Sequence, residues 1–471
     1  MKSDYKLVIG LETHVELQTK SKIFCSCPTA FGAEPNTHCC PVCTGEPGSL
    51  PILNKQVLAY AIRAGLATNC KISKITHMDR KNYVYPDLPK AYQISQFDEP
   101  ICVGGYVELA SGKRIRINHI HVEEDAGKLV HEDGYTYIDY NRGGVPLIEI
   151  VSEPDITDIA EAREYMEKLQ ITMRHIGVSD CKMQEGSMRC DVNISVHKEG
   201  EPFGTRTEIK NMNSLSFMEK ALAYEYARQC DVLDSGEKVV QETRRYNEGS
   251  QTTESMRSKE DAQDYRYFPE PDILTVEVSD EFVEAIRASM PELPDALKKR
   301  YVEEYGLGVT EADLIVKYKR IADFFNACAR EGNPKLAANL ILGQIFRGMQ
   351  TEEEKEAFEL KITPSQLAAL VKLQDEGKIN AQIARQTLQK MLTEGKDATA
   401  YLTAEDLAGV DDGAIDKLCA EAVANNARAV NDYRNGKAQA IKALVGYVMK
   451  ATRGKADAAA VERKLVALIG G

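Results

Sequence analysis

Four cysteines near the start of the chain have the types and spacing of a metal site. They stand as Cys25-x-Cys27 and Cys40-Pro-x-Cys43, two close pairs joined by a short loop. Four thiolates on two tight turns suit tetrahedral zinc, and such a site leaves no coordination position open for a substrate. We therefore predict a structural Zn²⁺ held by Cys25, Cys27, Cys40 and Cys43.

Two neighbouring residues compete with these ligands. Cys39 and His38 stand directly before the second pair, and we favour Cys40 over Cys39 because the Pro41-x-Cys43 step turns the chain suitably. Reduced thiols without metal are the alternative interpretation. The remaining cysteines are isolated along the chain, which fits a reducing compartment.

A second group of residues could do acid, base or metal chemistry. In residues 7–17 apolar side chains occupy every odd position except Thr13, and the even positions include Glu12, His14 and Glu16. Alternation of this kind predicts a strand that carries the three polar groups on one face, with neighbours about 6–7 Å apart. For a lone strand, the solvent face of a sheet edge would be a sufficient explanation.

Other segments supply more carboxylates. Glu149 stands inside the apolar run 145–151, where an unpaired carboxylate would cost several kcal/mol. Residues 188–196 alternate in the same way as 7–17 and carry Asp191 and Asn193 on their polar face, and residues 119–128 are rich in acid and imidazole. Several carboxylates and one imidazole on a sheet face predict a Mg²⁺ site, which in turn implies bound phosphates.

Basic, amide and tyrosine side chains stand in loop-like runs that suit a phosphate-bearing substrate such as ATP. Each run alone is more often a surface cluster of ion pairs. The chain contains neither a Walker P-loop nor a strand-linked GxGxxG motif. The candidate ATP- and substrate-binding residues are Arg80, Lys81, Tyr83, Tyr85, Lys90, Tyr92, Arg206, Lys210, Asn211 and Asn213.

The elements that must position these groups change character along the chain. A chain of 471 residues is expected to form two or three domains. Strand-like and mixed segments fill the first part, including a helix at 159–176 capped by Gly177, whereas almost only helical periodicity follows residue 292. We predict an α+β fold with a mixed-sheet cradle domain (1–292), an all-α helical domain (293–404) and a helical tail domain (405–471).

The net charge is −13, but residues 434–464 contain eight Lys or Arg against two acidic residues. A basic end of an acidic chain could contact nucleic acid, and a solvated helical face is the alternative. No apolar run is long enough to span a bilayer and no leader precedes the first strand, so we expect a cytoplasmic protein that does not enter a membrane.

Eight segments of the chain have distinctive motifs. They are IGLETHVEL at 9–17, FGAEPN at 31–36, the run 79–96, EEDAGK at 123–128, NRGGVPLIEIVSEP at 141–154, YRYFPEPD at 265–272, DYRNGK at 432–437 and LVGYVMKA at 444–451. Together these motifs resemble a known family, the B subunit of glutamyl-/aspartyl-tRNA amidotransferases (GatB), over essentially the whole chain. In the tail, Leu444 and Tyr447 stand where the family more often has Phe and Gln.

The resemblance implies a reaction and partners. ATP phosphorylates the side-chain carboxylate of mischarged Glu-tRNA(Gln) or Asp-tRNA(Asn) in this subunit. Ammonia from a GatA-type amidase subunit then displaces phosphate, and a GatC-type small subunit completes a heterotrimer. The tail would bind the tRNA.

The resemblance also implies which residues of this chain bind Mg²⁺. His14, Glu124 and Glu149 are the ligands that it implies. Strict alternation from His119 would instead align Glu123 with the histidines, and we favour Glu124 because residues 125–127 signal the end of the strand. The resemblance also implies Glu12 and Glu185 as catalytic residues, and we add Asp191 from the polar face of residues 188–196.

Two other functions compete with this one. The first is a tRNA-binding scaffold stabilised by structural zinc, with all catalysis in a partner subunit. Such a scaffold would bind no magnesium nucleotide. A stand-alone metallohydrolase would need an open transition-metal site, for which a single His14 among carboxylates is a poor ligand set.

Overall fold

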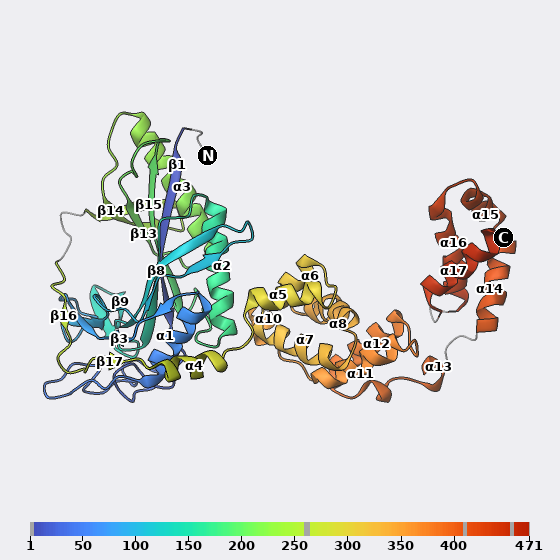
Figure 1. Ribbon diagram of the computed structural model, residues 1–471, viewed down its shortest axis with the longest axis horizontal. Coiled ribbons are helices and arrows are strands. Elements are labelled where there is room, and N and C mark those ends of the chain that lie inside the picture. Colours follow the sequence, from blue (N-terminus) through green and yellow to red (C-terminus); the bar gives the residue numbers. More distant parts are fainter. Residues whose placement is uncertain (1–3, 259–263, 408–411, 453–455, 471) are drawn as a thin grey trace. The chain divides into compact units, whose positions relative to one another are not determined.

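The computed structural model describes residues 4–258, 264–407, 412–452 and 456–470 and divides into two compact units, Met1–Leu293 and Pro294–Gly471. In its described residues the first unit combines a large sheet with helices α1 to α4, and the described part of the second is helical (Figure 1). The predicted α+β fold class is thereby confirmed. None of the described helices is both long and apolar enough to cross a bilayer.

A ten-stranded mixed sheet is the frame of the first unit. Along the sheet the order is β15-β14-β13-β12-β1-β11-β8-β6-β2, with β7 also paired to β8. Only the β13–β14 pair is parallel among these pairings. The strands are β1 (Lys6–Glu16), β2 (Lys71–Ile72), β6 (Cys102–Val103), β7 (Tyr106–Glu108), β8 (Arg114–Glu124), β11 (Pro146–Ser152), β12 (Met188–His197), β13 (Thr207–Lys210), β14 (Glu242–Asn247) and β15 (Thr252–Ser258).

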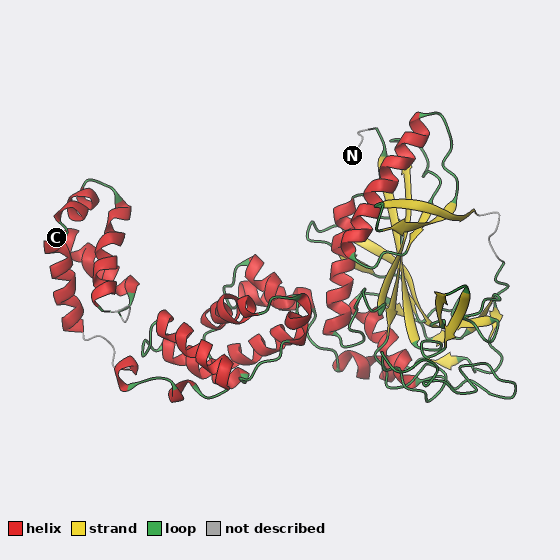
Figure 2. Ribbon diagram, turned by 180° about the vertical axis from the view of Figure 1, so that it is seen from behind, coloured by secondary structure: helices red, strands yellow, loops and turns green. Residues whose placement is uncertain are grey.

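Strict alternation along β1 gives the sheet two different faces. Ile9, Leu11 and Val15 are buried in the main apolar core, to which helices α1 (Lys55–Ala67), α2 (Ile159–His175) and α3 (Leu215–Asp234) also contribute. Figure 2 shows the helices of this unit gathered on one side of the strands. The predicted helix is α2, and Gly177 follows its end with φ +70, as expected of a C-terminal cap.

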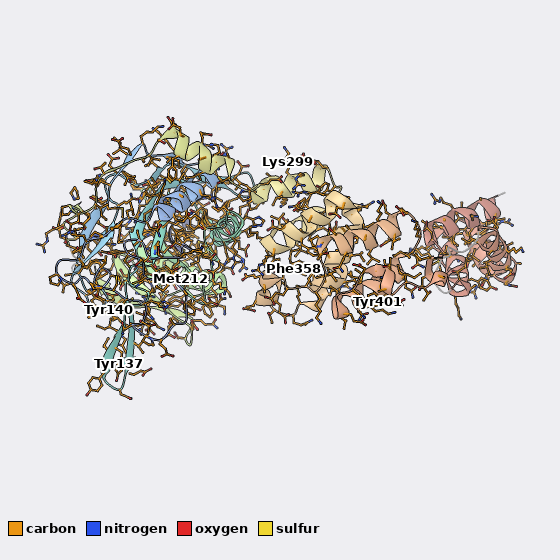
Figure 3. All side chains as sticks on the ribbon, turned by 90° about the horizontal axis from the view of Figure 1, so that it is seen from below. Tyr137, Tyr140, Met212, Lys299, Phe358 and Tyr401 are labelled. Atoms are coloured by element: carbon orange, nitrogen blue, oxygen red, sulfur yellow. The ribbon has the colours of Figure 1, made fainter. Side chains whose placement is uncertain are left out.

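Smaller strand pairs lie outside the main sheet. The hairpin of β9 (Lys128–Glu132) and β10 (Tyr135–Asp139) extends away from the rest of the unit, with Tyr137 on its projecting part (Figure 3). A three-stranded sheet joins β4 (Asp79–Asn82), β5 (Tyr92–Ser95) and β16 (Phe268–Pro269), and β3 (Ile75–Thr76) pairs with β17 (Val276–Glu277). Helix α4 (Asp280–Ala288) ends the unit.

Two apolar clusters lie in the second unit, one within residues 297–398 and the other within 415–469. Our division of this part at residue 405 stays a prediction. Its helices are α5 (Pro294–Glu303), α6 (Val309–Val316), α7 (Lys319–Glu331), α8 (Pro334–Leu340), a π-helix (Ile341–Ile345), α9 (Phe346–Gly348), α10 (Glu352–Ala357), α11 (Pro364–Asp375), α12 (Ala381–Glu394), two 3₁₀ turns (Ala398–Ala400 and Ala438–Ala440), α13 (Ala404–Leu407), α14 (Asp412–Asn425), α15 (Ala427–Arg434), α16 (Ile441–Ala451) and α17 (Ala458–Gly470).

Candidate active site

The register of the central strands aligns polar residues across the sheet face opposite the helices. His14 on β1 pairs with Glu149 on β11, and Glu149 pairs with His121 on β8. On the other side of β1, Glu12 pairs with Asp191 on β12. Directly opposed side chains in an antiparallel sheet lie about 5 Å apart at Cβ, so this register gathers groups from four strands.

Two of these groups, His14 and Glu149, form a candidate metal centre together with Glu123 of β8. His14 Nε2 lies 3.3 Å from Glu149 Oε2 and 3.6 Å from Glu123 Oε1. One ligand atom from each residue lies within 4.8 Å of the others. Gln93 donates to the second oxygen of Glu123 at 3.0 Å, which orients that carboxylate. One imidazole and two carboxylates can hold a divalent cation.

The structure places Glu123, and not Glu124, beside His14. Strand β8 keeps its alternation to its last residue, so Glu123 shares a face with His121, while Glu124 points to the other side. There Glu124 accepts from Lys90 Nζ at 2.7 Å and from the backbone amide of Ile94 at 2.9 Å. The two-residue alternation from His119 predicted Glu123 at this position, whereas the motif at 123–128 led us to favour Glu124.

His14 and Glu149 shift each other's pKa values in opposite directions. Burial alone would lower the pKa of His14, but its hydrogen bond with Glu149 and the charges of Glu149 and Glu123 raise that pKa to about 9. Burial would raise the pKa of Glu149, yet the bond with His14 and the charges of His121 and His14 hold it well below its usual range. The protonated form of His14 and the ionised forms of these carboxylates therefore stabilise one another.

A second acidic cluster lies beside the first. Oxygen atoms of Glu12, Asp191 and Glu208 lie within 4.8 Å of one another. Lys210 forms ion pairs with Asp191 and, at 3.1 Å, with Glu208. Burial and the neighbouring carboxylates raise the pKa of Glu12, and Asn193 donates to it at 2.9 Å. Of these residues, Glu208 was not among the predicted site residues.

The candidate phosphate-binding cations differ in their surroundings. Lys81 lies with its ammonium 5.0 Å from the centre of the Tyr265 ring. Burial disfavours its charge, but Glu123 and other neighbours raise its pKa. Arg80, in contrast, forms a bidentate pair with Glu270 at 2.6 and 2.8 Å. Lys81 is therefore available to an anion at the metal centre, whereas Arg80 holds β4 to the segment that contains β16.

The tyrosines of the same loop have mixed roles. Tyr92 packs against Arg80, whose guanidinium carbon lies 4.3 Å from the ring centre. Tyr83 makes an edge contact with Tyr265 at 5.8 Å between ring centres. Tyr85 is exposed and could stack against a base.

Some predicted residues are not brought to these clusters. Glu185 pairs with Lys182 at 2.9 Å in an exposed turn. Arg206 is exposed, and Asn213 contacts Glu248 at 3.4 Å on the surface. Asn211 adopts φ +70 and donates to the carbonyl of Tyr246 at 3.2 Å, a role in the turn after β13.

The four predicted zinc ligands come together. The sulfur atoms of Cys25, Cys27, Cys40 and Cys43 lie within 4.8 Å of one another. The pKa of Cys43 falls to about 4, chiefly through its hydrogen bond with Cys25 and also through Lys22. The buried Lys22 ammonium lies 3.7 Å from the Cys43 sulfur.

Cys39 stands apart from this cluster, with its sulfur 3.8 Å from the side-chain oxygen of Asn141. His38 donates its backbone amide to the same oxygen at 2.8 Å. The four thiols that do converge fit a tetrahedral zinc ion, with the Lys22 cation offsetting the excess negative charge of four thiolates.

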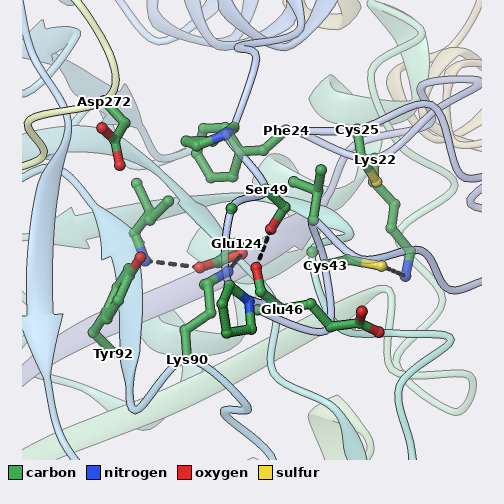
Figure 4. Close-up of a pocket in the computed structure, with 17 residues that line it drawn as sticks. Lys22, Phe24, Cys25, Cys43, Glu46, Ser49, Lys90, Tyr92, Glu124 and Asp272 are labelled. Carbon is green, nitrogen blue, oxygen red and sulfur yellow. Dashed lines mark hydrogen bonds and ion pairs between the residues drawn. The ribbon is translucent and has the colours of Figure 1, made fainter.

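A pocket of about 210 Å³ connects the cysteine cluster with the Lys90–Glu124 pair. Figure 4 shows Cys25 and Cys43 on one part of its wall and Lys90 with Glu124 on another. Gly45 has φ +72, and a Cβ there would come within 3.3 Å of the Lys90 backbone, so the cysteine loop and the Lys90 segment need glycine at their contact.

Comparison with known proteins gives consistent matches. The model of the GatB/GatE catalytic domain matches residues 7–284, and that of the GatB domain matches 323–469. The B subunit of the aspartyl/glutamyl-tRNA(Asn/Gln) amidotransferase from Caldicellulosiruptor saccharolyticus is 52% identical over 465 residues, covering 96% of this chain and 97% of the relative. The B subunit of the same enzyme from Carboxydothermus hydrogenoformans is 49% identical over 473 residues, covering 98% of each.

Proposed function

Because the chain belongs to the family of aspartyl/glutamyl-tRNA(Asn/Gln) amidotransferase B subunits, we propose that its polar sheet face is the amidation site. The activity is that of an ATP-using carbon–nitrogen ligase with glutamine as the nitrogen donor. The substrates are Glu-tRNA(Gln) or Asp-tRNA(Asn), and the products are Gln-tRNA(Gln) or Asn-tRNA(Asn).

The observation that carries this proposal is the convergence of His14, Glu123 and Glu149 on a half-buried sheet face beside Lys81. A divalent cation bound by these three side chains would neutralise charge on the phosphates of ATP. Lys81 adds a positive charge where two anions, the nucleotide and the substrate carboxylate, must approach each other.

The chemistry proceeds in two displacements. A carboxylate oxygen of the aminoacyl group attacks the γ-phosphorus, and ADP leaves with the bonding electrons. Ammonia then attacks the carbonyl carbon of the acyl phosphate, inorganic phosphate leaves, and the amide nitrogen loses a proton. An acyl phosphate is easily hydrolysed, and the partial burial of His14, Glu123 and Glu149 limits the access of water.

The partners follow from the same proposal. A GatA-type amidase subunit would release ammonia from glutamine, and a GatC-type small subunit would complete the assembly. The relatives are named as B subunits, which supports an assembly of several chains. We further propose that Zn²⁺ occupies the four-cysteine cluster, that Mg²⁺ serves ATP, and that the protein acts in the cytoplasm.

The test uses the chain reconstituted with both partner subunits. Glu149→Gln should reduce the release of ADP that mischarged tRNA stimulates by at least 100-fold, because it removes a ligand charge and leaves the fold intact. Glu199→Gln, on an exposed turn near Lys6, is the matched control and should retain normal ADP release. Unchanged ADP release in Glu149→Gln would exclude this site.

A further inference from the structure

Arg189 on β12 is a partly exposed cation that lies directly opposite His14 on the neighbouring strand β1. We propose that its guanidinium binds the side-chain carboxylate of the aminoacyl group and holds one of its oxygens through both displacements of the reaction. The inference rests on the proposed function, because it names the residue that receives the substrate of the same site. Arg189 was not among the predicted site residues.

The register of the strands places Arg189 at one end of a row of polar residues. Alternation along β12 puts it on the same face as Asp191. It pairs with His14 on β1, which in turn pairs with Glu149 on β11. Directly opposed side chains lie about 5 Å apart at Cβ, so the long side chain of Arg189 can reach a group that is bound at His14 and Glu149.

Asp125 anchors this side chain and leaves most of its donors unused. Nη2 of Arg189 donates to Asp125 Oδ2 at 2.9 Å, and the other oxygen of that carboxylate accepts from the backbone amide of Ala126 at 2.8 Å. Asp125 is almost fully buried, whereas 34% of the Arg189 side chain is exposed. A guanidinium has five N–H groups, and Asp125 is its only hydrogen-bond partner among the described residues. The remaining donors are therefore available to a ligand.

Several carboxylates surround Arg189 on this face of the sheet. Burial opposes the charge of Arg189, but Asp125, Glu16 and Glu123 raise its pKa, so the side chain remains a cation. A substrate carboxylate that approaches these acidic groups is repelled unless a cation meets it. Arg189 supplies that cation, and the planar fork of a guanidinium suits a carboxylate better than the point charge of an ammonium does.

Two lysines near the candidate metal centre are placed differently. The ammonium of Lys210 already forms ion pairs with Asp191 and Glu208. Lys81 belongs to β4, which is joined to β8 through β5, so it reaches the centre from the side opposite to β12. Lys81 and Arg189 thus flank the metal ligands, one for each of the two anions that must meet there. Lys81 serves the nucleotide phosphates, and Arg189 serves the carboxylate.

Arg189 then acts in both displacements of the proposed reaction. One carboxylate oxygen attacks the γ-phosphorus, while the other keeps its hydrogen bond to Arg189 and becomes the carbonyl oxygen of the acyl phosphate. When ammonia attacks the carbonyl carbon, an electron pair of the C=O bond moves onto the same oxygen, and the guanidinium stabilises the resulting oxyanion. Inorganic phosphate leaves as the C=O bond forms again, and the amide nitrogen loses a proton.

Binding of two aminoacyl-tRNAs to the chain assembled with both partner subunits, in the absence of ATP, tests the inference. Glu-tRNA(Gln) carries a carboxylate where Gln-tRNA(Gln) carries an amide, so the wild type should bind the former about tenfold more tightly. Arg189→Gln should reduce this ratio to one or below and slow the formation of Gln-tRNA(Gln) by roughly 100-fold, with unchanged affinity for ATP. Arg116→Gln, which removes a bidentate pair with Asp155 far along β8 from Glu123, is the matched control and should keep the wild-type ratio.

Arg189→Lys is the second variant, because it keeps a cation beside the buried Asp125 if Arg189→Gln does not fold. It should retain a preference for Glu-tRNA(Gln) but form the amide roughly tenfold more slowly, since an ammonium lacks the fork. Weaker ATP binding with an unchanged tRNA ratio would place Arg189 on the phosphates, and an unchanged ratio and rate would remove it from the site. Either result would overturn the inference and leave the proposed function intact. Normal ADP release by Glu149→Gln would instead overturn the proposed function, and the inference with it.

Discussion

Lys90 and Glu124 form an almost fully buried ion pair, 2.7 Å from Nζ to Oε2, in the wall of the pocket beside the cysteine cluster. Glu124 was expected at the metal centre, but its second oxygen accepts from the backbone amide of Ile94 instead. The pair thus joins the end of β8 to β5 and the loop before it.

Breaking this pair should loosen that part of the sheet. Lys90→Met leaves a buried carboxylate without its cation, which typically costs about 3–5 kcal/mol. Hydrogen exchange of the β5 and β8 amides would measure the loss. Glu124→Gln combined with Lys90→Met should recover most of it. The exposed pair of Lys6 and Glu199, 3.6 Å apart, is the control, and Lys6→Met should cost less than about 1 kcal/mol.

The cysteine cluster should hold one zinc ion per chain. Cys43→Ser should lose the metal and lower the thermal stability of the first unit, because structural zinc contributes directly to folding. Cys39→Ser should retain it, since that sulfur faces Asn141 rather than the cluster. Elemental analysis after dialysis gives the stoichiometry, and equal zinc content in the two variants would refute the ligand assignment.

Metal binding at the His14 centre should depend on pH. The pKa of His14 is raised to about 9, so the ring is protonated at pH 7.5 and must lose its proton to bind a metal. Apparent Mg²⁺ affinity should therefore rise with pH up to about 9 and level off above it. Titration calorimetry in buffers of different ionisation enthalpy should show close to one proton released per ion at pH 7.5 and almost none at pH 10. Proton release that does not change with pH would contradict the prediction.

The tail should carry part of the tRNA affinity. Lys437, Lys442 and Lys450 are exposed there. Replacing all three with Ala should weaken tRNA binding and reduce the slope of log affinity against log salt by about 2 to 3. Deletion of residues 406–471 should have a larger effect in the same direction. Fluorescence anisotropy at several salt concentrations measures the slope. An unchanged slope in both variants would show that the tail does not contact the tRNA.

The sequence alone determined which side chains share a strand face and where the helical part begins. Alternation in residues 7–17 placed Glu12, His14 and Glu16 together, and β1 confirms it. Such patterns are local, because side-chain direction alternates with every residue of a strand and burial selects one face. Applied to residues 119–124, the same alternation predicts Glu123 rather than Glu124 at the metal centre.

Only the tertiary structure decided the partners of those side chains. Glu270 lies 190 positions from Arg80 in the chain and takes it as an ion-pair partner. Asn118 on β8 donates to Glu153, which directly follows β11. Contacts of this kind follow from the register between distant strands, which the packing of the whole sheet sets and no local pattern encodes.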